Sequence, residues 1–125
     1  MTESSTSRTV LLVDDDNGIR ELVARALSFD GFDVIEAANG LEALTQLRSG
    51  RRPNVIVLDL RMPVMDGWAF RIAQRADPSI AQIPVVILSG ADSHRFQEID
   101  AVAALEKPIS LSQLADCLHQ VLEHV

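Results

Sequence analysis

The sequence predicts an α/β fold in which a five-stranded parallel sheet is doubly wound, with helices on both of its faces. Three observations support this prediction. Short apolar runs alternate five times with segments of helical periodicity, at about 25 residues per unit. Parallel strands need a crossover connection, which is usually a helix. The 47% share of hydrophobic residues in 125 is enough for one core, so we expect a single domain.

Five short segments are expected to form the strands. Residues 9–13, 55–58 and 85–88 are continuous apolar runs that are too short for helices. Such runs are typical of strands that are buried on both faces of a sheet. Two weaker candidates, residues 34–37 and 101–105, complete the set of five strands.

Helical periodicity follows each of the first three strands. Apolar residues repeat at three- and four-residue steps over residues 19–27, and Gly31 is placed to end this helix. The same spacing over residues 41–47 predicts a second helix before Gly50. Residues 68–73 predict a third helix from a less regular pattern.

The two remaining helices differ in the strength of their signals. Residues 92–99 are polar and poorly patterned, and they predict only a short helix. The last helix has a clear start, because Ser110 and Gln113 form an S-x-x-Q capping box. An apolar face on residues 111–122 follows this box and predicts the rest of the helix.

Composition and charge exclude several classes of function. The net charge of −7 repels phosphates of nucleic acids and anionic lipids, so we expect no direct binding to nucleic acid or membranes. The single cysteine, Cys117, cannot form an internal disulfide. No apolar run approaches the roughly 18 to 20 residues of a membrane span, and no signal-peptide core is present. We expect a cytoplasmic protein with a disordered tail over residues 1–8 and the domain over residues 9–125.

Acidic residues stand where an open parallel sheet carries its functional site, beyond the carboxyl ends of the strands. Asp14, Asp15 and Asp16 follow the first predicted strand. We expect Asp16 to cap the next helix. Clustered carboxylates would repel a bare phosphate and attract a hard dication. Asp14 and Asp15 therefore argue against a dinucleotide or flavin site.

Three further polar residues stand at the ends of the other strands. Asp59 ends the third strand, Ser89 ends the fourth and Lys107 follows the fifth. Each of these, taken alone, is more often a turn, cap or snorkelling side chain. Lys107 is, however, the only lysine in the chain. Carboxylates, a hydroxyl and an ammonium at one sheet edge suit the joint binding of a phosphoryl group and Mg²⁺.

With these residues the chain resembles the receiver domain of two-component response regulators, over about residues 9–124. The resemblance rests on residues 11–16 (Leu-Leu-Val-Asp-Asp-Asp), 59–67 (Asp-Leu-Arg-Met-Pro-Val-Met-Asp-Gly), 88–90 (Leu-Ser-Gly) and 107–108 (Lys-Pro). Asp59 lies 44 positions after Asp15, and Ser89 lies 30 positions after Asp59. These separations are usual in the family, and the resemblance implies a flavodoxin-like (βα)5 fold.

The resemblance implies a phosphoacceptor and a divalent ion, Mg²⁺ or Mn²⁺. Asp59 corresponds to the phosphoacceptor, which also lies in the metal site. Asp15 corresponds to a direct metal ligand, and Asp14 to a second acidic residue that usually acts through a water. The family's third protein ligand is a backbone carbonyl, here that of Arg61. The implied phosphodonor is a sensor histidine kinase or a histidine phosphotransfer protein, and the downstream partner is unknown.

Other positions of the family concern binding of the phosphoryl group. Ser89 corresponds to the hydroxyl that bonds one phosphoryl oxygen. Lys107 corresponds to the lysine that pairs with another oxygen, and its bond to Pro108 is usually cis in the family. Gly90 leaves room for the phosphoryl group. Gly67 fits a turn that needs an unhindered backbone before the third helix.

The switch region is expected to depart from the family's usual pattern. The position three before the lysine is commonly aromatic, but here it is Ala104, which has no rotamer to switch. The hydroxyl and the lysine are 18 positions apart, about four fewer than in many relatives, which removes roughly one helical turn. We expect the signal to be read through residues 89–100, and Arg61 and Ala91 to tune hydrolysis.

Alternative functions remain open at this point. A Mg²⁺-dependent aspartyl phosphatase of the haloacid dehalogenase type also uses a strand-end Asp, but residues 59–63 lack the second acid of its D-x-D-x-T pattern. A receiver that signals without phosphate is disfavoured, because every needed residue type is present. We expect no enzyme activity beyond the chain's own phosphorylation and dephosphorylation. The chain is either a single-domain regulator, which Met1 and the tail favour, or a receiver excised from a hybrid or multidomain protein.

Overall fold

The computed structural model describes residues 8–90 and 100–123 of the chain. This part contains five strands and four helices. They run in the order β1 (Thr9–Val13), α1 (Asn17–Phe29), β2 (Asp33–Ala37), α2 (Gly40–Arg48), β3 (Val55–Asp59), α3 (Gly67–Arg75), β4 (Val85–Ser89), β5 (Ala103–Glu106) and α4 (Leu111–Glu123).

All five strands pair in parallel and form one sheet in the order β2-β1-β3-β4-β5. The chain moves outward from β1 to β2 on one side and then crosses to β3 on the other side of β1. The strand order therefore reverses between β1 and β3, and ligand sites of such sheets lie beyond the carboxyl ends of the strands at this point. The predicted doubly wound parallel sheet is confirmed.

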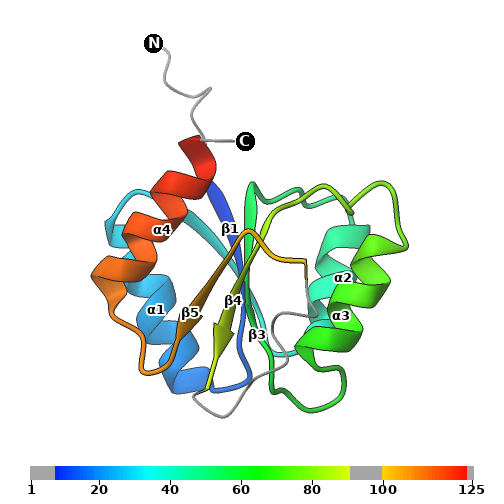
Figure 1. The fold of residues 1–125 in the computed structure, drawn as a ribbon, viewed down its shortest axis with the longest axis horizontal. Helices are drawn as coiled ribbons and strands as arrows, with labels where there is room; N and C mark the ends of the chain where they lie inside the picture. Colours follow the sequence, from blue (N-terminus) through cyan, green and yellow to red (C-terminus); the bar gives the residue numbers. More distant parts are fainter. Residues whose placement is uncertain (1–7, 91–99, 124–125) are drawn as a thin grey trace.

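Helices cover both faces of the sheet, with α1 and α4 on one face and α2 and α3 on the other (Figure 1). Two apolar clusters fill the layers between helices and sheet. In β1 they take alternate residues: Val10 and Leu12 face one cluster, and Leu11 and Val13 face the other. This is why the central strands appear in the sequence as unbroken apolar runs.

The strands and helices run in opposite directions, so the two ends of the described fold lie on one rim. Thr9 begins β1 and Glu123 ends α4 at the rim opposite the carboxyl ends of the strands (Figure 1). The longest described helices, α1 and α4, have 13 residues each. Within the described ranges, no helix has both the length and the apolar character that a membrane crossing requires.

The last strand differs in part from the predicted element. β5 begins at Ala103 rather than at residue 101, although the Val102 amide already donates to the Val85 carbonyl at 3.0 Å. β5 is an edge strand in which half-buried and exposed residues alternate, so its apolar pattern is weak and gives poor boundaries. The helix predicted over residues 92–99 lies outside the described residues, which contain the other four predicted helices.

The predicted helix ends are confirmed where hydrogen bonds identify them. The Asp16 carboxylate accepts from the Ile19 amide at 3.0 Å and so caps α1. Gly31 has φ of 98° just beyond the end of this helix, a conformation that glycine adopts at little cost. At the start of α4, the Ser110 hydroxyl accepts from the Gln113 amide at 3.3 Å.

A buried polar network under α3 was not predicted. Gln74 is fully buried, and its side-chain amide donates to the carbonyls of Ile80 at 2.9 Å and Ile83 at 3.1 Å. Arg71 is 9% exposed and donates to the Gln74 side-chain oxygen at 2.8 Å and to the Asp100 carbonyl. The network ties α3 to the loop after it and to the approach to β5.

We expect Gln74→Leu to lower the free energy of unfolding by about 2 kcal/mol, because two buried carbonyls would lose their donor. Denaturant unfolding measures this change. Gln82→Leu is the matched control, since Gln82 lies exposed in the adjoining loop and its replacement should change stability by less than about 0.5 kcal/mol. Equal effects of the two substitutions would show that the network contributes nothing specific.

Candidate functional site

The sheet brings polar residues from four strand ends to one rim. Asp59 and Ser89 are the last residues of β3 and β4, and Asp14 and Lys107 directly follow β1 and β5. Asp59 pairs in register with Leu88, the neighbour of Ser89. The Lys107 amide donates to the Ser89 carbonyl at 2.8 Å, which continues the ladder between β4 and β5. The backbone thus holds these positions next to one another before any side-chain contact is considered.

Three carboxylates meet at this rim, as the sequence predicted. Asp14, Asp15 and Asp59 each offer one oxygen, and these oxygens all lie within 4.8 Å of one another. Asp14 is 3% exposed and Asp59 is 4% exposed, whereas Asp15 is open to solvent. Carboxylate oxygens are the ligands that Mg²⁺ prefers. The donor set therefore suits a small hard cation, with Asp15 on the open side.

Lys107 provides the cation that contacts this cluster in the described structure. Its Nζ lies 3.0 Å from Asp59 Oδ1. Burial raises the pKa of Asp59, and the charges of Asp14 and Asp15 raise it further, while the hydrogen bond and charge of Lys107 partly offset this. The Lys107–Pro108 peptide is cis, as the resemblance implied. One ammonium does not balance three carboxylates, so the site favours additional positive charge.

The turn that carries the first two acids is held by backbone and side-chain bonds. The Asp14 amide donates to the Ala37 carbonyl at 3.1 Å, and Asp14 Oδ1 accepts from the Asp16 amide at 2.9 Å. Arg20, which the sequence analysis did not single out, donates to the Asp14 carbonyl at 2.7 Å. Arg20 lies five positions after Asp15 along the chain, and no sequence motif marks its contact with the Asp14 carbonyl.

The loop after β3 passes very close to the site. The Gly67 amide donates to the Leu60 carbonyl at 2.9 Å. A Cβ atom at Gly67 would lie 2.8 Å from the Leu60 side chain and 2.9 Å from the Asp59 carbonyl oxygen. The predicted need for an unhindered backbone at Gly67 is therefore confirmed, and its cause is this close approach. Arg61 lies two positions after Asp59, with its side chain exposed.

The residues predicted to form the switch region are only partly described. Ser89 is 5% exposed at the end of β4, and Gly90 after it is half-buried. Ala104 lies exposed on β5, and its methyl group is too small to cover that part of the edge strand. Ala91 lies outside the described residues, as does most of the segment 89–100.

Comparison with known proteins identifies the family to which this chain belongs. The sequence profile of the response regulator receiver domain matches residues 10–119. Response regulator MprA of Mycobacterium sp. (strain KMS) is 38% identical over 109 residues, which cover 84% of this chain and 46% of that protein. The chain thus spans about half the length of the curated relatives it matches.

Solved structures give the same result for the fold. The signal receiver domain of a signal transduction histidine kinase from Syntrophus aciditrophicus has a TM-score of 0.88 at 29% identity, covering 95% of this chain and 92% of that one. The chemotaxis response regulator CheY4 of Vibrio cholerae has a TM-score of 0.83 at 32% identity, covering 93% and 99%. From the profile match, the sequence identity and the shared fold, we conclude that the chain belongs to the response regulator receiver domain family.

Proposed function

We propose that the chain is a signalling switch that accepts a phosphoryl group on Asp59 and then presents a changed surface to a partner. The observation that carries this proposal is the buried Asp59 carboxylate, 3.0 Å from the Lys107 ammonium and inside a cluster of three acids. In our proposal residues 9–125 form the receiver domain and residues 1–8 a tail. The family match supports this function over the phosphatase alternative, and Arg61 stands two positions after Asp59, where the phosphatase pattern requires a second acid.

The chemistry we propose is transfer from a phosphohistidine. An oxygen of the Asp59 carboxylate attacks the phosphorus, the P–N bond breaks, and its electron pair remains on the imidazole nitrogen of the donor. The product is an acyl phosphate on Asp59, which water attacking in line hydrolyses. Negative charge on the equatorial oxygens is stabilised by the Lys107 ammonium and by a hydrogen bond from the Ser89 hydroxyl. The chain therefore catalyses only its own phosphorylation and dephosphorylation.

We propose that Mg²⁺, or Mn²⁺ in its place, binds in the carboxylate cluster. Asp15, Asp59 and the backbone carbonyl of Arg61 would hold the ion directly, and Asp14 would act through a water. A bound divalent ion supplies positive charge to the phosphoryl oxygens. The three neighbouring carboxylates and the burial of two of them support this assignment.

The proposed phosphodonor is a sensor histidine kinase or a histidine phosphotransfer protein, and the downstream partner is a protein. The net charge of −7 supports an output other than direct binding to nucleic acid or membranes, and we expect the chain to act in the cytoplasm. Relatives include a response regulator about twice as long and a receiver domain of a histidine kinase. The chain therefore acts either as a single-domain regulator or as the receiver of a larger protein.

We expect the protein to take up one phosphoryl group from acetyl phosphate in the presence of Mg²⁺, and Asp59→Asn to take up none. Intact mass spectrometry measures the uptake, and Asp66→Asn is the matched control, since Asp66 caps α3 and asparagine caps equally well. Turnover of a phosphate ester without stable modification would favour the phosphatase. Phosphorylation of Asp59→Asn to the wild-type extent would refute the assignment of Asp59.

The raised pKa of Asp59 predicts a pH-dependent stability. The folded state binds the Asp59 proton more tightly than the unfolded state, so protonation favours folding at low pH, and this contribution is lost as pH rises through the folded-state pKa. At neutral pH and without divalent ions, we expect Asp59→Asn to be more stable than wild type by on the order of 1 kcal/mol.

Thermal or denaturant unfolding at several pH values tests this prediction. The difference between Asp59→Asn and wild type should shrink as pH falls toward the ordinary aspartate pKa of about 3.9, and also on addition of Mg²⁺. Asp16→Asn, at the exposed N-cap of α1, should show neither effect. A difference that is constant with pH would mean that the Asp59 charge carries no cost in the folded protein.

A further inference from the structure

We infer that Arg20 is a positioning residue for the metal site, because it fixes the backbone from which Asp15 projects. This inference rests on the proposed function, in which Asp15 is a direct ligand of Mg²⁺. Arg20 itself contacts neither Asp15 nor Asp59 in any described hydrogen bond, and it acts through the Asp14 carbonyl.

The Arg20 guanidinium makes two contacts, each to a different element. Its Nη1 donates to the Asp14 backbone carbonyl at 2.7 Å, and its Nε donates to Glu36 Oε1 at 3.0 Å. The Arg20 side chain is 13% exposed, and its bond to the Asp14 carbonyl is partly buried, whereas its bond to Glu36 is exposed. A hydrogen bond from a charged donor is stronger than one between neutral groups. Arg20 therefore links α1, the turn after β1 and the edge strand β2.

The hydrogen bond from Arg20 to the Asp14 carbonyl restrains the backbone orientation of the next residue, Asp15. This carbonyl belongs to the peptide plane that joins Asp14 to Asp15, and the plane is rigid. Two other polar atoms of Asp14 already have partners, since its amide donates to the Ala37 carbonyl and its Oδ1 accepts from the Asp16 amide. The carbonyl bond to Arg20 is thus the third restraint on this turn, and it is the one that sets the direction in which the chain enters Asp15.

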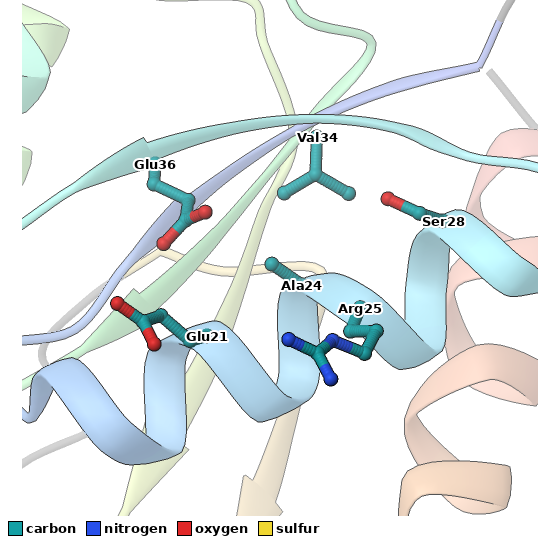
Figure 2. A pocket seen from close by; sticks show the side chains of 6 residues that line it. All are labelled: Glu21, Ala24, Arg25, Ser28, Val34 and Glu36. Atoms are coloured by element: carbon teal, nitrogen blue, oxygen red, sulfur yellow. The ribbon is translucent and has the colours of Figure 1, made fainter.

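Glu36 orients Arg20 from the opposite side. It stands in register with Leu12 on β1, one residue before the Ala37 carbonyl that holds the Asp14 amide. Figure 2 shows Glu36 projecting from β2 toward α1. Glu36 is one of the residues that line a groove of about 440 Å³ between these two elements. Glu36 is 39% exposed, so its ion pair contributes little to stability and serves mainly to aim the guanidinium.

The same groove provides a matched control. Arg25 lies on α1 five positions after Arg20 and lines this groove with Glu36 and Glu21 (Figure 2). Its side chain is exposed, and it lies beyond the turn that carries Asp14. Replacing Arg25 removes a positive charge from the same helix without removing a bond to that turn.

If Arg20 positions Asp15, loss of Arg20 should weaken Mg²⁺ binding, whereas if Arg20 acts only through its charge, its loss should strengthen Mg²⁺ binding. A nearby positive charge repels a divalent cation, so removal of a cation that acts only through its charge would tighten Mg²⁺ binding. Removal of a positioning residue would loosen it, because Asp15 would then have to be ordered when the ion binds. The sign of the change in affinity therefore decides between the two.

The experiment is titration of the whole chain with Mg²⁺ alone, followed by calorimetry, with no phosphodonor present. We expect Arg20→Met to raise the dissociation constant at least fivefold and Arg25→Met to change it less than twofold. Amide hydrogen exchange at Asp15 and Asp16 in the metal-free protein should accelerate in Arg20→Met only. An unchanged or lower dissociation constant in Arg20→Met would overturn the inference.

Exchanging the charges of residues 20 and 36 distinguishes the contribution of their ion pair to Mg²⁺ binding from that of the bond to the Asp14 carbonyl. The double variant Arg20→Glu with Glu36→Arg restores an ion pair but puts an acceptor opposite the Asp14 carbonyl, so we expect Mg²⁺ binding to stay at least fivefold weakened. Recovery of wild-type affinity would overturn the inference, and this test also stands if Arg20→Met fails to fold. A wild-type chain that binds no Mg²⁺ would instead refute the proposed function itself.

Discussion

The crowding of three carboxylates around one lysine is the constraint on which the rest of the site depends. Asp14 and Asp59 are withdrawn from water, and burial raises the pKa of Asp59, with a further contribution from the charge of Asp14. A flexible chain would relieve this repulsion by moving the acids apart. The parallel ladder prevents that, because Asp59 and Ser89 end paired strands and Asp14 is bonded to β2 through Ala37. The rigid sheet thus keeps the three carboxylates together although their charges repel one another.

The immediate surroundings of the acids follow from the same constraint. Gly67 lets the loop after β3 pass against the Asp59 carbonyl, where any side chain would collide. Lys107 reaches Asp59 from the far side, at the end of an edge strand. Both features keep the cluster compact while Asp15 stays exposed, so the open side of the site is acidic and accessible to an incoming ion or donor.

Much of the fold and of the site could be predicted from the sequence, because the signals were local. Strands buried on both faces appear as unbroken apolar runs, and residues that follow such runs in a parallel sheet meet at one edge. The predictions were less complete where long side chains bridge distant elements. Arg20 and Gln74 each act through backbone carbonyls elsewhere in the fold, and neither contact leaves a pattern in spacing or composition. The start of β5 was displaced by two residues in the prediction, because the apolar run at residues 101–105 begins before the strand does.

The position of Thr9 and Glu123 on the rim away from the acids has a consequence for communication. This rim is about 17 Å from the rim that carries Asp59, the length of a five-residue strand. Physiological salt screens charge over about 8 Å, so a phosphate on Asp59 would exert little direct electrostatic force there. A fused neighbour would have to sense the modification mechanically, through shifts in the sheet or by competing for a shared surface.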